Sequence, residues 1–227
     1  MNDFYLDEWL TSALSKKSYF VKRIQDSYTE PKDAELLFSK CQVNDLDQFY
    51  KFQSNGYNVI ECSVNLIKIV DKKFDFQIDK TLRLAKISDK DGIKKIAKES
   101  FINDRFHSDP KISNKVASRL KEEWVDNFFK GRRGDEMIVA YEKDEILGFI
   151  LLIYANDFAV IDLIAVSQRH RRLGIAKKMI QFLFLLAREK FKFINVGTQL
   201  NNLSALNLYL SLGFEINDAK YTLHKHC

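Results

Sequence analysis

The chain has 227 residues, of which 46% are hydrophobic and 13% aromatic, which is ample for a packed core but short for two full domains. Its 36 basic and 31 acidic residues leave a net charge of +5 without a dense basic tract, so the composition does not call for a nucleic-acid partner. The cysteines Cys41, Cys62 and Cys227 are odd in number and scattered, which argues against a disulfide framework or a metal site.

The charge pattern predicts a cytoplasmic protein with no membrane partner. The first residues are acidic, whereas a signal peptide begins with a basic segment followed by an apolar one. The most apolar region, residues 146–166, is interrupted by Asp157 and Asp162, so it is not expected to cross a membrane.

Several short elements are predicted in the first 77 residues. Residues 18–21 favour a strand, and residues 31–37 favour a short helix with a proline in its first turn. A helix capped at residue 44 or 45 runs to about Gln53, and residues 57–69 are expected to be extended, with a bend.

This N-terminal region resembles the other end of the chain. Phe49-Tyr50, Gly56-Tyr57 and Val64-Asn65-Leu66 parallel Leu208-Tyr209, Gly213-Phe214 and Tyr221-Thr222-Leu223, with the same ten-residue step from glycine to leucine. The loop from helix to glycine is expected to be two residues longer in the first copy. The match predicts a partial internal copy that lacks a phosphate loop, and chance is the alternative, since helix-glycine-strand is a common order.

Strands and helices are also predicted throughout residues 78–227. Strands are expected at 81–85, 137–141, 146–154, 158–166, 193–198 and 221–224. Helices are expected at 88–102, 113–130, 172–189 and around Tyr209.

A basic turn joins the apolar strand 158–166 to the helix that follows it. Such a turn points the free N–H groups of the first helical turn outward, and the helix dipole adds partial positive charge. Arg169, Arg171 and Arg172 add formal charge, and Gly174 lets the backbone approach a phosphate. The turn therefore predicts a pyrophosphate site, with a solvated helix start as the alternative.

A dense polar segment, residues 104–110, follows the first helix of the second region. Arg105 is suited to pair with a phosphate and Phe106 to stack on a base or sugar, and His107 lies beside them. An ordinary capped loop is the alternative.

Two stretches resemble the motifs of a known family. Residues 171–176, Arg-Arg-Leu-Gly-Ile-Ala, resemble the Gln/Arg-x-x-Gly-x-Gly/Ala acyl-CoA loop of the Gcn5-related N-acetyltransferases (GNAT). Residues 202–214 are similar to that family's Asn-x-x-Ala-x-x-x-Tyr-x-x-x-Gly-Phe helix. The resemblance implies an α/β (α+β) GNAT fold, with a mixed, mostly antiparallel central sheet flanked by helices. A catalytic domain at 78–227 would follow a partial GNAT-like region at 1–77.

The same resemblance implies that acetyl-CoA is the cosubstrate and that no metal takes part. Tyr209 occupies the position of the phenol that protonates the departing thiolate, with core packing as the alternative. The residues expected to bind the cosubstrate are Leu163, Ile164, Ala165, Val166, Arg171, Arg172, Leu173, Gly174, Ile175, Ala176 and Asn202. The acceptor amine would attack the thioester directly, and Asp162, His107, His224 or an ordered water would take its proton.

Across nearly its whole length the chain looks like the bacterial TDP-fucosamine N-acetyltransferases. The resemblance rests on Arg105-Phe106, the Gly-Thr-Gln-x-x-Asn-x-x-Ala start of the last helix at 197–205, and the closing Tyr-x-Leu-His at 221–224. It implies a nucleotide-linked amino sugar as acceptor, held by Arg105, Phe106 and His107, for cell-surface polysaccharide. Other amino sugars, a protein N-terminus, a small amine or antibiotic, and a non-catalytic acyl-CoA sensor are the alternatives. Homodimerisation stays open.

Overall fold

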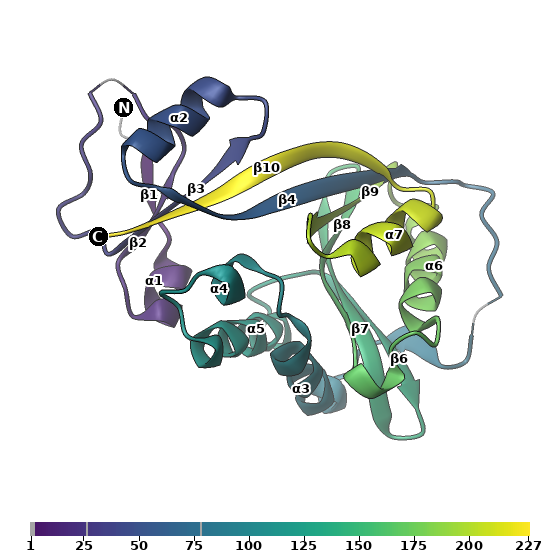
Figure 1. Cartoon of the computed structure of the whole chain (residues 1–227). Coiled ribbons are helices and arrows are strands. Elements are labelled where there is room, and N and C mark those ends of the chain that lie inside the picture. The colour runs from purple at the N-terminus through teal and green to yellow at the C-terminus, as the bar shows by residue number, and fades with distance from the viewer. Residues whose placement is uncertain (1–2, 26, 78) are drawn as a thin grey trace.

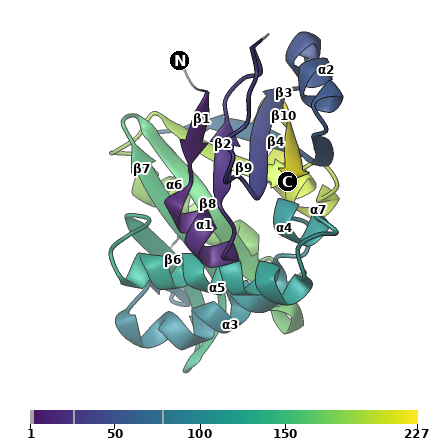
Figure 2. The ribbon, with the colours of Figure 1, turned by 90° about the vertical axis from the view of Figure 1, so that its left-hand side faces the viewer.

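The computed structural model describes residues 3–25, 27–77 and 79–227. Within these ranges the strands form a ten-stranded sheet in the order β1-β2-β3-β10-β4-β9-β8-β7-β6-β5. Pairing is parallel between β2 and β3 and between β8 and β9, and antiparallel between the other neighbours. The sheet is thus mixed and mostly antiparallel, with helices packed against it, which confirms the predicted fold class (Figures 1 and 2).

The elements have the following bounds. The strands are β1 (Phe4–Leu6), β2 (Ser18–Val21), β3 (Leu36–Gln42), β4 (Asn58–Ile69), β5 (Leu82–Leu84), β6 (Glu136–Glu142), β7 (Glu145–Ala155), β8 (Phe158–Val166), β9 (Phe193–Gln199) and β10 (Glu215–His226). The helices are α1 (Glu8–Leu14), α2 (Leu46–Ser54), α3 (Lys90–Ser100), α4 (Arg105–Ser108), α5 (Asn114–Phe129), α6 (Ile175–Ala187) and α7 (Leu203–Ser211), with short 3-10 turns at Ile87–Asp89 and Gln168–His170.

Strand β6 shows how alternating apolar residues place helices on both faces of the sheet. Ile138 and Ala140 belong to the core that includes α6, whereas Met137 and Val139 pack in the core that includes α3 and α5. Successive strand residues point to opposite faces, so an apolar strand binds helices on both sides. Figure 1 shows α3 and α5 on one side of β6 and β7 and α6 on the other.

A repeat runs through the fold with a constant spacing. Strand β3, helix α2 and strand β4 recur as β9, α7 and β10, each beginning and ending 157 residues later, as Leu36 and Phe193 do. Asp45 and Asn202 cap the two helices with their side chains. Gly56 and Gly213 follow the helices at φ values of 82° and 78°, which L side chains rarely adopt.

The two repeats exchange their last strands. Strand β4 pairs with β9, and β10 pairs with β3, while β4 and β10 run antiparallel side by side (Figure 1). Ser63 pairs with Lys220, which occupies the equivalent position in the second repeat. The two register shifts skip Ile60 and Asn217, which are also equivalent positions. The N-terminal strands therefore share one sheet with the rest of the chain.

Two expectations for the N-terminal region were wrong. Residues 31–37 do not form a helix, because Leu36 and Leu37 begin β3 and are fully buried where it inserts between β2 and β10. The loop from helix to glycine has the same length in both repeats, so the counterpart of Tyr209 is Phe52 rather than Tyr50.

The division of the chain into residues 1–77 and 78–227 stays a prediction. Residue 78 itself lies outside the described residues. On the N-terminal side, β4 pairs with both β9 and β10, so this region contributes a central strand of the sheet and also a wall of the site described below.

Candidate active site

Strands β8 and β9 run parallel and then separate. Their pairing extends from Phe158 and Phe193 to Ile161 and Val196 and stops there. Asp162 follows as a bulge in β8, where pairing with β7 shifts register. Beyond the bulge, residues 163–166 pair with β7 on one side and not with β9 on the other. The Val166 carbonyl accepts from Arg171 Nε at 3.3 Å, and the other backbone groups on that side can bind an extended ligand in the gap.

The turn after β8 leaves the first N–H groups of α6 uncapped by a side chain. Helix α6 begins at Ile175 rather than at the predicted residue 172, because Arg172 and Gly174 adopt φ values of 64° and 76° that a right-handed helix cannot contain. A Cβ added at Gly174 would meet nothing within 4 Å, so backbone conformation favours glycine here, rather than lack of space.

A cavity of about 530 Å³ extends from this turn to Tyr209 and is called the thioester cavity below, after the cosubstrate that the sequence predicts. The predicted cosubstrate residues that line it are Ile164, Ala165, Val166, Arg171, Arg172, Gly174, Ile175, Ala176 and Asn202. Leu163 lies instead in the neighbouring cavity, and Leu173 is 64% exposed and outside both. His170, which was not predicted, also lines the thioester cavity.

Tyr209 lies where this cavity meets the next one. Its side chain is 2% exposed, and burial raises the pKa of the phenol, so the hydroxyl stays protonated at neutral pH. Asn202 caps the helix that carries Tyr209 by accepting from the Ala205 N–H, and its amide donates to Thr198 Oγ1 at 3.2 Å.

A second cavity, of about 620 Å³, adjoins the first and is called the acceptor chamber below. Its walls come from both halves of the chain, including β3 and β4 of the N-terminal region. Tyr209, Asn202 and Gln199 line both cavities. A molecule in the chamber therefore lies next to one in the thioester cavity.

The predicted acceptor residues separate in the structure. Arg105 and Phe106 line the chamber, but Phe106 is 2% exposed and carries the Arg105 guanidinium 4.6 Å over its ring. His107 lies outside the chamber, with Nδ1 2.9 Å from Asp104 Oδ2 and Nε2 3.3 Å from Ser118 Oγ.

The candidate bases are also separated. Asp162 lines the chamber, but both of its oxygens accept from Arg133, at 2.6 and 2.7 Å; burial raises the pKa of Asp162, and Arg133 opposes that rise. His224 is buried outside the chamber, with Nδ1 2.6 Å from Asp109.

Glu61 was missed in the sequence, although it lines the chamber with one oxygen free. Oε1 accepts from Thr222 Oγ1 at 3.2 Å, while Oε2 is buried and has no hydrogen-bond partner among the described residues. Burial raises the pKa of the Glu61 carboxyl, and the charge of Arg105 opposes that rise. The alternation of side chains along β4 could have revealed Glu61 in the sequence. Glu61, Ser63 and Asn65 line the chamber, whereas Val64 and Leu66 are buried in the core.

A cluster of Asp109, His224 and His226 brings together three atoms able to ligate a metal, all within 4.8 Å of one another. The two imidazole nitrogens lie 2.6 and 2.8 Å from the same oxygen of Asp109, which are hydrogen-bond distances. Burial opposes ionisation of Asp109, but these bonds outweigh it and lower the pKa of the carboxyl. The cluster ties the end of β10 to the segment after α4.

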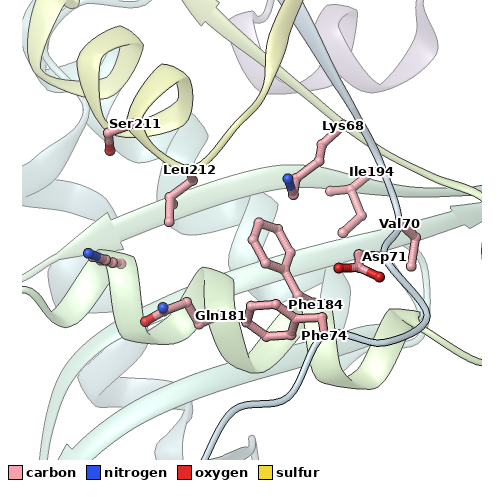
Figure 3. A pocket seen from close by; sticks show the side chains of 10 residues that line it. Lys68, Val70, Asp71, Phe74, Gln181, Phe184, Ile194, Ser211 and Leu212 are labelled. Carbon is pink, nitrogen blue, oxygen red and sulfur yellow. The ribbon is translucent and has the colours of Figure 1, made fainter.

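Figure 3 shows a smaller cavity of about 280 Å³ beside α6, outside the acceptor chamber. Phe74 and Phe184 meet edge to face at its centre, and the ammonium of Lys68 lies 5.3 Å over the Phe184 ring. Lys177, on the first turn of α6, lines both this cavity and the thioester cavity.

Comparisons with known proteins agree on one protein family. Residues 95–214 match the model of the acetyltransferase (GNAT) family. The spore coat polysaccharide biosynthesis protein SpsD of Bacillus subtilis is 32% identical over 143 residues, which cover 60% of this chain and 47% of SpsD. Streptothricin acetyltransferase of Escherichia coli is 39% identical over 80 residues, which cover 34% of this chain and 45% of that protein.

Solved structures agree on the fold. A GCN5-related N-acetyltransferase from Sphaerobacter thermophilus superposes with a TM-score of 0.60 at 13% identity, over 84% of this chain and 59% of that one. The chain thus spans about half the length of the two relatives above and less than two thirds of this structure. Throughout the described ranges, every helix is too short or too polar to cross a bilayer.

Proposed function

The chain belongs to the GNAT acetyltransferase family, and from this premise we propose that it is an acetyl-CoA-dependent N-acetyltransferase acting on a nucleotide-linked amino sugar. The acceptor would be dTDP-linked, the product would serve cell-surface polysaccharide, and the reaction would take place in the cytoplasm. The observation that carries the proposal is the meeting of two cavities at Tyr209, one beside the basic turn before α6 and one lined by charged side chains.

The thioester cavity suits acetyl-CoA by the chemistry of its walls. The uncapped N–H groups of α6 and the side chains of Arg171 and Arg172 would bind the pyrophosphate. The free backbone of residues 163–166 would bind the amide groups of the pantetheine arm. When bound, acetyl-CoA supplies a thioester carbon that an amine can attack.

Two side chains at the junction would move the protons. Tyr209 keeps its proton at neutral pH and would donate it to the departing sulfur. Glu61 would accept the proton that the amine loses, directly or through a water, because its Oε2 has no hydrogen-bond partner in the described part of the chain. Holding the two substrates side by side would supply much of the remaining rate enhancement.

Similarity to SpsD, whose name refers to spore coat polysaccharide biosynthesis, supports a sugar as acceptor. The chamber volume of about 620 Å³ is within the range of small-molecule sites. Four cations and three carboxylates line the chamber, namely Lys40, Arg105, Lys121, Arg133, Glu61, Asp104 and Asp162, a balance that favours an anionic acceptor over a polycationic one.

A second candidate is acetylation of a small amine antibiotic. The similarity to streptothricin acetyltransferase favours this function, although it covers 34% of the chain. A cationic antibiotic would have to approach Arg105 and Lys121 in the same chamber.

The two candidates differ in the amine that is consumed. Acetyl-CoA turnover should be measured with dTDP-linked and UDP-linked amino sugars, aminoglycosides, streptothricin and short peptides. We expect turnover with a dTDP-linked amino sugar at a kcat/KM at least a hundredfold above that for the other classes. Preference for streptothricin would make the antibiotic the acceptor, and preference for peptides would make this a protein acetyltransferase.

A further inference from the structure

Aromatic rings hold the cations along one wall of the acceptor chamber. The guanidinium of Arg105 lies between two rings, 4.5 Å from Phe38 and 4.6 Å from Phe106. Trp124 lies between two cations, with the ammonium of Lys121 at 4.4 Å and the guanidinium of Arg133 at 4.3 Å. Ring faces attract cations without using their N–H donors, so a cation held this way can still donate hydrogen bonds.

Two donors on this wall are unused. Arg105 Nη1 and Trp124 Nε1 are buried and find no hydrogen-bond partner in the described ranges. A buried donor that bonds neither protein nor solvent costs free energy, so groups of this kind are rare unless a ligand satisfies them. Both side chains line the chamber, and the ammonium of Lys121 lies 4.4 Å from the ring centroid of Trp124 and 5.7 Å from that of Phe106.

The carboxylates of the chamber have other partners. Asp162 accepts two hydrogen bonds from Arg133. Asp104 caps α4 and lies 2.9 Å from His107, with the ammonium of Lys121 at 3.7 Å. Glu61 bonds Thr222, and no ion pair to Arg105 is formed within the described part of the chain. The charges of Glu61 and Asp104 stabilise the Arg105 guanidinium, but within the described residues neither acid hydrogen-bonds to its Nη1, which stays available to a ligand.

We propose that Arg105 and Trp124 bind the diphosphate of the acceptor, each donating a hydrogen bond to its anionic oxygens, with Lys121 adding charge beside Trp124. The proposal rests on the nucleotide-sugar function and assigns the specificity for a phosphorylated acceptor to this wall. Charge-assisted bonds from a guanidinium and a neutral indole N–H are both suited to phosphate oxygens. Arg105 and Trp124 select the substrate, whereas Tyr209 and Glu61 handle protons.

Binding of dTDP tests the wall without any acetyl transfer. Calorimetry in the presence of CoA would compare dTDP with inorganic pyrophosphate and with thymidine, which lacks phosphate. Arg105→Lys keeps the charge but loses Nη1, and Trp124→Phe keeps a ring but loses the N–H. Matched controls are Arg119→Lys and Trp9→Phe. In the wild type, Arg119 donates to Ala13 O, and Trp9 packs against Trp124 and a core cluster.

We expect dTDP to bind wild type at least tenfold more tightly than thymidine. Each wall variant should weaken the binding of dTDP and of pyrophosphate about tenfold, and each control variant should bind both within about twofold of the wild-type affinity. The KM for acetyl-CoA should not change, which would also show that the variants fold. Equal binding of dTDP and thymidine, or wild-type dTDP affinity in both wall variants, would overturn the proposal.

The outcome separates this inference from the proposed function. Dependence of dTDP binding on Arg105 and Trp124, without turnover of any nucleotide sugar, would uphold the diphosphate site and reject the proposed acceptor. Turnover of a dTDP-amino sugar with an unchanged acceptor KM in both variants would uphold the function and reject the role of this wall. If Arg105→Lys fails to fold, Trp124→Phe alone still decides.

Discussion

Thr222 donates a hydrogen bond to one oxygen of Glu61 at 3.2 Å, directly across the pairing of β10 with β4. The other oxygen of Glu61 is buried in the acceptor chamber and is unbonded within the described ranges. The counterpart of this contact in the second repeat joins Asp218 to Asn65 at 2.8 Å. The repeat thus places a carboxylate at the same position in both copies, and of the two, Glu61 lines the chamber.

Replacing this carboxylate should slow the chemistry. We expect Glu61→Gln to lower kcat about a hundredfold to a thousandfold, because the amide keeps the shape but cannot accept the proton of the amine. The KM for acetyl-CoA should stay within about twofold. Asp218→Asn is the matched control and should retain wild-type kcat. A Gln variant with wild-type kcat would remove Glu61 from the proton path.

Tyr209→Phe should slow the other proton transfer, which is the one to the departing sulfur, to a similar degree. The variant keeps the ring that packs 5.5 Å from Phe214 but lacks the hydroxyl, so kcat should fall about a hundredfold while acetyl-CoA still binds. The control is Tyr50→Phe, at a tyrosine that is 65% exposed.

The pH profile gives an independent check on Tyr209. Burial raises the pKa of Tyr209 above its ordinary value of 10.0, so wild-type kcat should not decline between pH 8 and about pH 10. A decline in that range that disappears in Tyr209→Phe would mean that the phenol ionises there, contrary to this expectation.

The basic turn should control affinity for acetyl-CoA. We expect Arg171→Ala to raise the KM for acetyl-CoA about tenfold with little change in kcat, because the side chain lines the thioester cavity. Arg169, which is exposed and outside that cavity, supplies the control Arg169→Ala. The wild-type KM should also rise with added salt, more steeply than that of Arg171→Ala. Identical KM values in the two variants would contradict a phosphate role for Arg171.

The cluster of Asp109, His224 and His226 should make stability depend on pH. Burial lowers the pKa of His224 in the folded state, although its bond to Asp109 opposes this, so the unfolded chain binds more protons as the pH falls. The free energy of unfolding should therefore fall below about pH 6.5, by at most about 1.4 kcal/mol per pH unit from this group. Urea unfolding at pH 7.5 and 5.5 would measure it. His224→Gln should show a smaller drop, and an equal drop would exclude His224 as the cause.

Local patterns in the sequence determined the strands and helices that carry the cosubstrate motifs. The apolar run 158–166 coincides with β8, and the helix predicted at 113–130 is α5, which the side chain of Ser113 caps. The turn at 171–176 adopts the positive φ values that its glycine favours. These features depend on neighbours within a few residues, which is the range over which periodicity, capping and glycine act.

Tertiary pairing decided the rest. Residues 31–37 have the sequence pattern of a helix start, yet the last two of them begin a strand that is buried between β2 and β10. Strand β10 begins at Glu215, six residues before the predicted start at 221. Glu61 lines one chamber with residues of the second repeat because two repeats 157 residues apart exchange strands. The sequence alone therefore determined the family motifs and the basic turn before α6, since both are local. Only tertiary packing brought together the donors of Arg105 and Trp124, which lie on α4 and α5 and have no hydrogen-bond partner among the described residues.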